Sequence, residues 1–339
     1  MFSLNIWGYL EDKILNSAIL TIVVPCFNEE EVLPETVIKL SGILEQLINK
    51  EKISKDSKVL FVNDGSQDQT WNLIQKFTEQ YKIITGIKFS RNYGHQNALL
   101  AGMTVAKDYS DMIITIDADL QDDVNAIPQM VDKYLDGYDV VYGVRNDRQT
   151  DTFFKRKTAL AFYGVMKKMG VQMVPNSADY RLLSQRAVAS LLKYKERNLF
   201  LRGMVPLVGY RSTNVYYVRK ERFAGKSKYP LKKMVNFAFD GITSFSIAPI
   251  HVIFDLGVLI VLVGIVMMGY ILIQKILGDV VSGWSSLMIS IWVLGGVQLI
   301  SISVIGEYVG KVFSEVKQRP RYVIEEDDFT KNVEVKKKQ

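Results

Sequence analysis

Two long apolar runs near the carboxyl end of the chain constrain its fold most. The first, LGVLIVLVGIVMMGYILI, covers Leu256 to Ile273 and contains no charged residue. With the preceding IAPIHVIFD it can cross a hydrocarbon core about 30 Å thick at roughly 1.5 Å per residue. The second, WSSLMISIWVLGGVQLISISVIG, covers Trp284 to Gly306, and a short turn joins the two. Both runs are too long and too apolar for a buried soluble hairpin. We therefore expect two antiparallel membrane helices, over residues 247–273 and 284–306.

Basic residues flank the hairpin at its outer ends. The intervening turn has only Lys275, whereas the flanks carry many cations: Arg219, Lys220, Arg222, Lys226, Lys228, Lys232 and Lys233 before the first run, and Lys311, Lys317, Arg319 and Arg321 after the second. Basic residues favour the cytosolic side of a membrane. We expect a plasma (inner) membrane protein with two spans, both termini in the cytosol, and a charged cytosolic tail over residues 307–339. The last part of that tail, EEDDFTKNVEVKKKQ, is expected to be mobile.

Three further segments combine apolar and charged residues. Residues 1–18 lack the basic leading region and unbroken apolar stretch of a signal peptide, so we expect an amphipathic segment there. Residues 228–246 directly precede a span, which favours an amphipathic juxtamembrane helix at the lipid interface. For residues 151–170, an interfacial helix and a helix packed on the sheet remain equal alternatives.

Residues 19–145 alternate between short β-rich runs and helical patterns. The runs are ILTIVVPCF, KVLFVND, ITGIKFS, DMIITIDAD and DVVYGVR, and the helical patterns lie at residues 30–49, 67–80, 96–107 and 124–135. This alternation predicts a Rossmann-like α/β domain over residues 19–227, with a mostly parallel sheet flanked by helices. Ligands of such sheets bind outside the carboxyl ends of the strands.

The bulk composition narrows the partners. A formal net charge of +6 over 339 residues suits an anionic partner. Nucleic acid and an anionic membrane are the default candidates, and the apolar runs favour the membrane over nucleic acid. The single cysteine, Cys26, excludes an intrachain disulfide and lies in an apolar stretch, so we interpret it as a core residue.

The stretch ITIDADLQDD places four carboxylates within seven positions at the end of an apolar run. Alternation along a strand points Asp117 and Asp119 the same way. With the amide of Gln121 they form an oxygen-rich half-shell that suits Mg²⁺ or Mn²⁺ and leaves positions for a diphosphate. A helix cap by Asp122 or Asp123 is the alternative for that pair. It does not account for Asp117 and Asp119.

The other strand ends add polar residues. Asp64 lies in the turn VNDGSQDQT, where a carboxylate can accept hydrogen bonds from a sugar hydroxyl or a base imide. The alternative role for polar residues of this turn is to cap the following helix, through Ser66 or Asp68. We expect both ligand binding and helix capping here, carried by different residues.

Taken in order, VVPCFNEE, VNDGSQDQT, SRNYGHQNALLAG, DADLQDD and NSADYRLLSQRAV resemble the family 2 glycosyltransferases, which have a GT-A fold. The following RFAGKSKY and the two spans are similar to the polyprenyl-phosphate subgroup, which includes dolichyl-phosphate mannose synthases and bacterial undecaprenyl-phosphate glucosyltransferases. The resemblance implies a metal-dependent, inverting enzyme for cell-envelope glycosylation that moves a sugar from a nucleotide sugar to a polyprenyl phosphate. UDP-glucose and undecaprenyl phosphate are the expected pair. GDP-mannose, a UDP-N-acetylhexosamine and a UDP-aminopentose are the alternative donors.

The resemblance also implies roles for individual residues. It assigns the nucleotide sugar to Pro25, Asn28, Glu29, Asp64, Asp117 and Arg145, the metal to Asp117, Asp119 and Gln121, and the acceptor phosphate to Arg222, Ser227 and Lys228. Catalysis falls to Asp119, Asp179, Arg222 and Lys228. A lipid monophosphate is mostly dianionic at neutral pH, because its second pKa is about 6. We therefore expect Asp179 to be less critical for proton removal than the equivalent carboxylate in enzymes with hydroxyl acceptors, while it can still orient the acceptor or the sugar.

Other classes fit less well. A dinucleotide-binding oxidoreductase needs a glycine-rich turn after the first strand, but here that turn is PCFNEEE. The AGKS at residues 224–227 lacks the earlier glycine of a P-loop, because position 220 is Lys220. A non-enzymatic membrane-anchored scaffold would not need paired carboxylates. The exposed surface of two membrane helices suits a homo-oligomer, with a tetramer among the candidate states.

Overall fold

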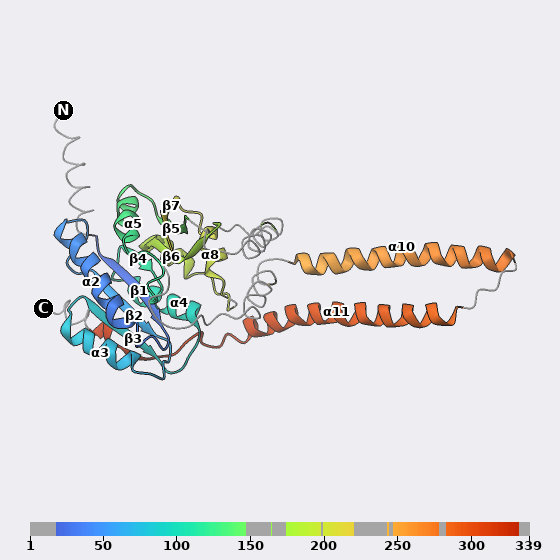
Figure 1. Cartoon of the computed structure of the whole chain (residues 1–339), viewed down its shortest axis with the longest axis horizontal. Helices are drawn as coiled ribbons and strands as arrows, with labels where there is room; N and C mark the ends of the chain where they lie inside the picture. The colour runs from blue at the N-terminus through green and yellow to red at the C-terminus, as the bar shows by residue number, and fades with distance from the viewer. Residues whose placement is uncertain are drawn as a thin grey trace, which may run out of the picture. The chain divides into compact units, whose positions relative to one another are not determined.

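The computed structural model describes residues 18–146, 164, 174–197, 199–219, 243, 247–277 and 283–331. These residues fall into two compact units (Figure 1). One is an α/β unit that includes residues 319–331 from the carboxyl end of the chain, and the other is a helical unit that includes residues 247–277 and 283–318.

The α/β unit is built on one mixed sheet whose described strands follow the order β7-β5-β6-β4-β1-β2-β3-β8. Their bounds are β1 Leu20–Cys26, β2 Lys58–Asn63, β3 Ile84–Phe89, β4 Met112–Thr115, β5 Val140–Arg145, β6 Ser177–Ser184, β7 Ser212–Tyr217 and β8 Ile324–Asp327. The pairs β1–β2, β2–β3, β1–β4 and β5–β7 are parallel, whereas β6 pairs antiparallel with β4 and β5, and β8 with β3. The predicted mostly parallel sheet is confirmed, although β6 separates β4 from β5.

Helices cover both faces of this sheet (Figure 1). One face carries α2 (Leu33–Asn49), α3 (Thr70–Gln80) and α5 (Ala126–Leu135), and the other carries α4 (His95–Ala106), α7 (Gln185–Leu191) and α8 (Leu201–Leu207). The alternation along β1 accounts for both layers. Ile22 and Val24 join the core under α2, whereas Val23 points to α4, where a Cβ added at Gly102 would lie 2.3 Å from it. The polar residues after β1, β2 and β4 are thereby fixed at one edge of a rigid sheet.

The described part of the carboxyl-terminal segment, up to Lys331, differs from the mobile tail that the charge pattern predicts. Strand β8 pairs with β3, and Lys88 on β3 lies 3.1 Å from Glu325 and 3.2 Å from Glu326. Phe329 is 1% exposed and packs edge-on against Tyr109, with ring centroids 5.7 Å apart. The charged residues of this segment thus bind an edge of the sheet while its aromatic residue enters the core.

The helical unit contains α10 (Ala248–Leu277) and α11 (Trp284–Val316). Two stretches, Ala248–Met267 and Val293–Val316, are long and apolar enough to cross a membrane, and none of their residues with a described exposure is buried. Helix α11 continues past Gly306, where the apolar run ends. The amphipathic helices predicted over residues 1–18, 151–170 and 228–246 lie, except for Ala18, Gly164 and Thr243, outside the described residues.

Candidate active site

The loops that follow β1 and β2 hold each other in place. The backbone N–H of Asn28 donates to Ser66 Oγ at 3.0 Å, and the side chain of Asn28 accepts from the backbone N–H of Gln67 at 2.9 Å. Glu29 donates its backbone N–H to Thr70 Oγ1 at 2.9 Å. Two residues predicted to bind the nucleotide, Asn28 and Glu29, therefore lie at the carboxyl edge of the sheet. Pro25, a third, is buried within β1.

Asp64 supports the neighbouring loop. Its two carboxylate oxygens accept the backbone N–H groups of Tyr93 at 2.6 Å and Gly94 at 2.9 Å, and the residue is 3% exposed. Burial raises the pKa of this carboxyl group, and the two N–H donors oppose the rise. Gly65 adopts φ 65°, and a Cβ there would lie 2.3 Å from the backbone of Arg91. The turn around Asp64 thus fixes the segment that leads into α4, a role that the sequence did not predict.

The acidic loop lies beyond the strand on which the sequence placed it. Strand β4 ends at Thr115, so Asp117 lies beyond the strand and Asp119 lies in the turn that follows, and strand alternation does not govern their directions. Leu120 adopts φ 57°, a left-handed conformation that costs a residue with a Cβ roughly 1–2 kcal/mol. Asp119 is 8% exposed and accepts the backbone N–H of Gln121 at 3.1 Å. The loop is therefore a sharply turned structure that needs support from its neighbours.

The predicted metal ligands fit a site completed by a substrate. Oδ1 of Asp117 is buried and accepts no hydrogen bond from the described residues, although His95 Nε2 lies 3.4 Å away. The pKa of Asp117 is raised to about 6, chiefly by burial and further by the nearby carboxylates, while His95 opposes the rise. The described residues contain no cluster of three or more ligating side chains. Two carboxylates are what Mg²⁺ typically takes from a protein when substrate phosphates supply the rest. The amide oxygen of Gln121, the third predicted ligand, accepts from Arg219.

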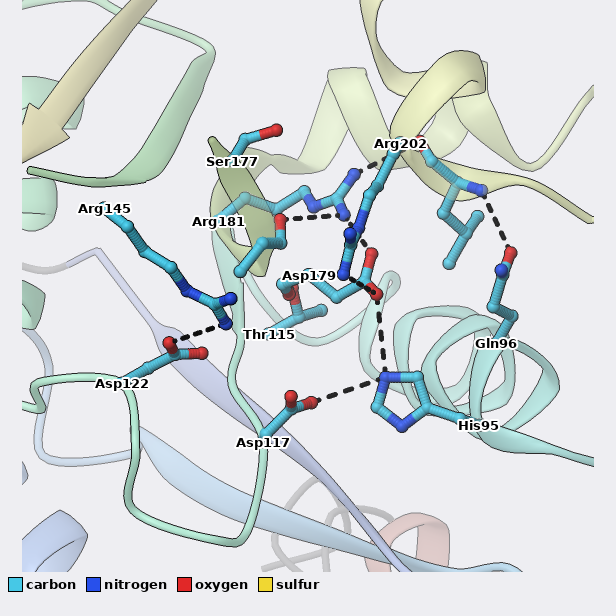
Figure 2. A network of polar contacts seen from close by, with 12 residues as sticks. His95, Gln96, Thr115, Asp117, Asp122, Arg145, Ser177, Asp179, Arg181 and Arg202 are labelled. Atoms are coloured by element: carbon cyan, nitrogen blue, oxygen red, sulfur yellow. Dashed lines mark hydrogen bonds and ion pairs between the residues drawn. The ribbon is translucent and has the colours of Figure 1, made fainter. Parts of the chain in front are cut away.

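Across His95 from Asp117 lies a second charged group, built on β6 and α8 (Figure 2). Asp179 Oδ2 is 3.8 Å from His95 Nε2 and 3.4 Å from Arg202 Nη2, and Oδ1 is hydrogen-bonded to Arg181. Arg181 is 3% exposed and also donates to the carbonyls of Leu201 and Ala178. Burial alone would raise the pKa of Asp179, but Arg202 and Arg181 outweigh it and hold that pKa well below its usual range. Asp179 is a fixed anion.

Arg145 lies at the end of β5 and contacts the acidic loop. Its guanidinium is 3.2 Å from Asp122 Oδ1 (Figure 2). It also donates to Tyr217 Oη at 3.3 Å. Asp122 does not cap α5, which begins at Ala126. The predicted acceptor residues Arg222, Ser227 and Lys228 lie outside the described residues.

The model of the family described as "Glycosyl transferase family 2" matches residues 21–192, about half of the chain. The chain belongs to glycosyltransferase family 2. It is 54% identical over 315 residues to the uncharacterized glycosyltransferase YkoT of Bacillus subtilis (strain 168), covering 93% of this chain and 94% of that protein. It is 39% identical over 307 residues to the SfII prophage-derived bactoprenol glucosyl transferase of Shigella flexneri, covering 90% and 97%.

Among solved structures, a glucosyl-3-phosphoglycerate synthase from Mycobacterium tuberculosis, in complex with Mn²⁺, UDP and phosphoglyceric acid, matches with a TM-score of 0.45 and 16% identity. The match covers 69% of this chain and 79% of that one. The family resemblance drawn from the motifs is confirmed by the family model and the curated relatives.

Three polar residues of the candidate site were not predicted from the sequence: His95, Arg181 and Arg202. His95 lies in the SRNYGHQNALLAG motif and is the first residue of α4, directly after the N-cap residue Gly94, which takes φ 95°. A glycine directly before a polar residue was the one sequence signal that could have indicated His95 as a site residue. Arg202 lies on the short helix α8, where Pro206 interrupts the helical pattern, so neither the helix nor its arginine could be recognised.

Proposed function

We propose that this glycosyltransferase moves glucose from UDP-glucose to undecaprenyl phosphate, with inversion at the anomeric carbon, for cell-envelope glycosylation. The observation that carries the proposal is the pairing of Asp179 with Arg181 and Arg202. A carboxylate held ionised by two guanidinium groups is a poor general base. A hydroxyl acceptor requires such a base, whereas a phosphate that is already dianionic does not. The site therefore favours a phosphate as the acceptor.

Two further features agree with a lipid phosphate. The candidate spans on α10 and α11 give the enzyme access to a membrane-held substrate. One relative is named a bactoprenol glucosyl transferase, which supports a glucosyl donor and a polyprenyl acceptor. We propose that the α/β unit and both termini face the cytosol, where nucleotide sugars are found, and that the enzyme forms a homo-oligomer.

The reaction is a direct displacement. A phosphate oxygen of the acceptor forms a bond to the anomeric carbon while the bond to the diphosphate breaks, and UDP leaves with the electron pair. Asp117 and Asp119 would hold Mg²⁺ or Mn²⁺, which neutralises charge on the leaving diphosphate. Asp179 and Arg202 offer a hydrogen-bond acceptor and a donor side by side, and so orient the sugar. Arg222 and Lys228 would bring the acceptor anion beside the donor.

The test is a donor panel with purified full-length enzyme and undecaprenyl phosphate, read by mass spectrometry of the lipid product. We expect a hexosyl phospholipid from UDP-glucose, and none with chelator or with Asp119→Asn. Asp123→Asn, a carboxylate of the same loop that is not a predicted ligand, is the matched control and should retain most activity. Product only from GDP-mannose, a UDP-N-acetylhexosamine or a UDP-aminopentose would change the donor. No product from any donor would favour a scaffold.

A further inference from the structure

A buried polar cluster lies directly behind the acidic loop. Asp122 is 2% exposed, and its Oδ1 accepts a hydrogen bond from Tyr217 Oη at 2.5 Å and lies 3.2 Å from Arg145 Nη2. The hydroxyl of Tyr180 on β6 donates to the carbonyl of Asp123 at 3.1 Å. The Tyr180 ring packs edge-on against that of Tyr217, with ring centroids 5.3 Å apart. We call these residues the loop clamp: Asp122, Arg145, Tyr180 and Tyr217. Three strands thereby hold the two residues that follow the predicted metal ligands.

The acidic loop needs such support. Strand pairing ends at Thr115, and Leu120 is held in the left-handed region. Asp119 already uses one oxygen to accept the N–H of Gln121, so its direction depends on the backbone of the loop. A conformation of this cost persists only where surrounding contacts determine it. At the carboxyl end of the loop, the described contacts to the sheet are made by Asp122, with Tyr217 and Arg145, and by the carbonyl of Asp123, with Tyr180.

A role in folding alone explains the clamp less well. A buried ion pair contributes little net stability compared with apolar residues of similar size, because both charges lose their hydration. The clamp instead fixes the direction of one short segment. Partners behind the first ligands of a metal typically affect its affinity about ten- to a hundred-fold.

We propose that Tyr217 is a positioning residue for the metal site: its hydroxyl fixes Asp122, and thereby the loop that carries Asp119 and Gln121. The inference rests on the proposed function insofar as that function uses a divalent cation. Tyr217 itself contacts none of the three predicted ligands through any described hydrogen bond. Its effect should therefore appear in metal affinity rather than in the chemical step.

The test compares Tyr217→Phe with Tyr216→Phe in the full-length enzyme. Phe at position 217 keeps the buried ring against Tyr180 and removes only the hydroxyl. Tyr216 is the neighbouring residue on the same strand and is 57% exposed, so its loss of a hydroxyl is the matched control. Mn²⁺ binding is measured in the presence of UDP by electron paramagnetic resonance. Hydrogen exchange of residues 116–125 and turnover over a range of Mn²⁺ concentrations are measured alongside.

For Tyr217→Phe we expect Mn²⁺ affinity to fall roughly ten-fold, exchange of the loop to accelerate, and kcat at saturating Mn²⁺ to stay near that of the unmodified enzyme. Tyr216→Phe should change none of these. If the unmodified enzyme binds Mn²⁺ and transfers sugar but Tyr217→Phe has an unchanged Mn²⁺ affinity, the positioning role of Tyr217 is wrong and the proposed function still stands. If the unmodified enzyme binds no Mn²⁺ beside UDP, the metal part of the proposed function fails as well.

Discussion

At the scale of single residues, the charge state of Asp179 decides what kind of acceptor the site suits. Both carboxylate oxygens have cationic neighbours, and burial is outweighed by Arg202 and Arg181, so the pKa stays well below its usual range. A group with a depressed pKa is ionised at every pH above that value and gains a proton only in strong acid. Between pH 5 and 9 it cannot produce a step in the rate.

Asp179→Asn should therefore lower turnover by a similar factor at every pH from 5 to 9. Any fall in rate near pH 6 comes from groups other than Asp179: the acceptor phosphate, whose second pKa is about 6, and Asp117, whose pKa burial raises to about 6. It should therefore persist in the variant. The measurement is kcat against pH at saturating Mn²⁺, with thermal unfolding recorded because Arg181 loses its buried partner. Disappearance of an acidic limb in Asp179→Asn would instead make this residue the general base.

At the scale of elements, the sequence predicted what depends on local pattern. The five runs that became β1 to β5 are rich in Val and Ile, and the four helical patterns lie within a few residues of α2, α3, α4 and α5. Strand β6 escaped notice because NSADYRLLS mixes charges with apolar residues: Asp179 and Arg181 are buried together as a pair, which no single-residue hydropathy reveals. Loop contacts such as those of Asp64 could not be predicted from the sequence pattern either, because the partners are backbone N–H groups, which every residue except proline has.

Strand β8 was missed for a similar reason, because its charged sequence resembles a solvated tail. The nearby Phe329 is the residue of this segment whose type indicates burial in the core. Phe329→Ala should destabilise the α/β unit by roughly 3–5 kcal/mol, because a fully buried ring is lost beside Tyr109. Val323→Ala, in the same segment at 47% exposure, is the control and should cost little. Denaturant unfolding of both variants checks this. Equal stabilities would mean that the segment contributes no core packing.

At the scale of the whole molecule, the course of the chain limits how it can cross a membrane. The chain leaves the α/β unit after β7, forms α10 and α11, and then returns as β8 to the sheet that it left. A single crossing would place β8 on the opposite side of the bilayer from β3, its hydrogen-bonded neighbour. The hairpin must therefore cross an even number of times, or not at all. The basic residues that flank the hairpin in the sequence predict its orientation: both flanks on the cytosolic side, because cations favour that side.

Cysteine labelling in intact cells separates these possibilities. Gly283→Cys lies between the two helices and should react with a membrane-impermeant maleimide added outside. Lys331→Cys, whose native side chain is 72% exposed, should react only after the cells are permeabilised. The native Cys26 is buried, and burial raises the pKa of its thiol well above the usual value, so the background should be low. Labelling of Lys331→Cys alone from outside would invert the topology and remove access to cytosolic UDP-glucose. Labelling of neither before permeabilisation would mean that the helices lie on the membrane without crossing it.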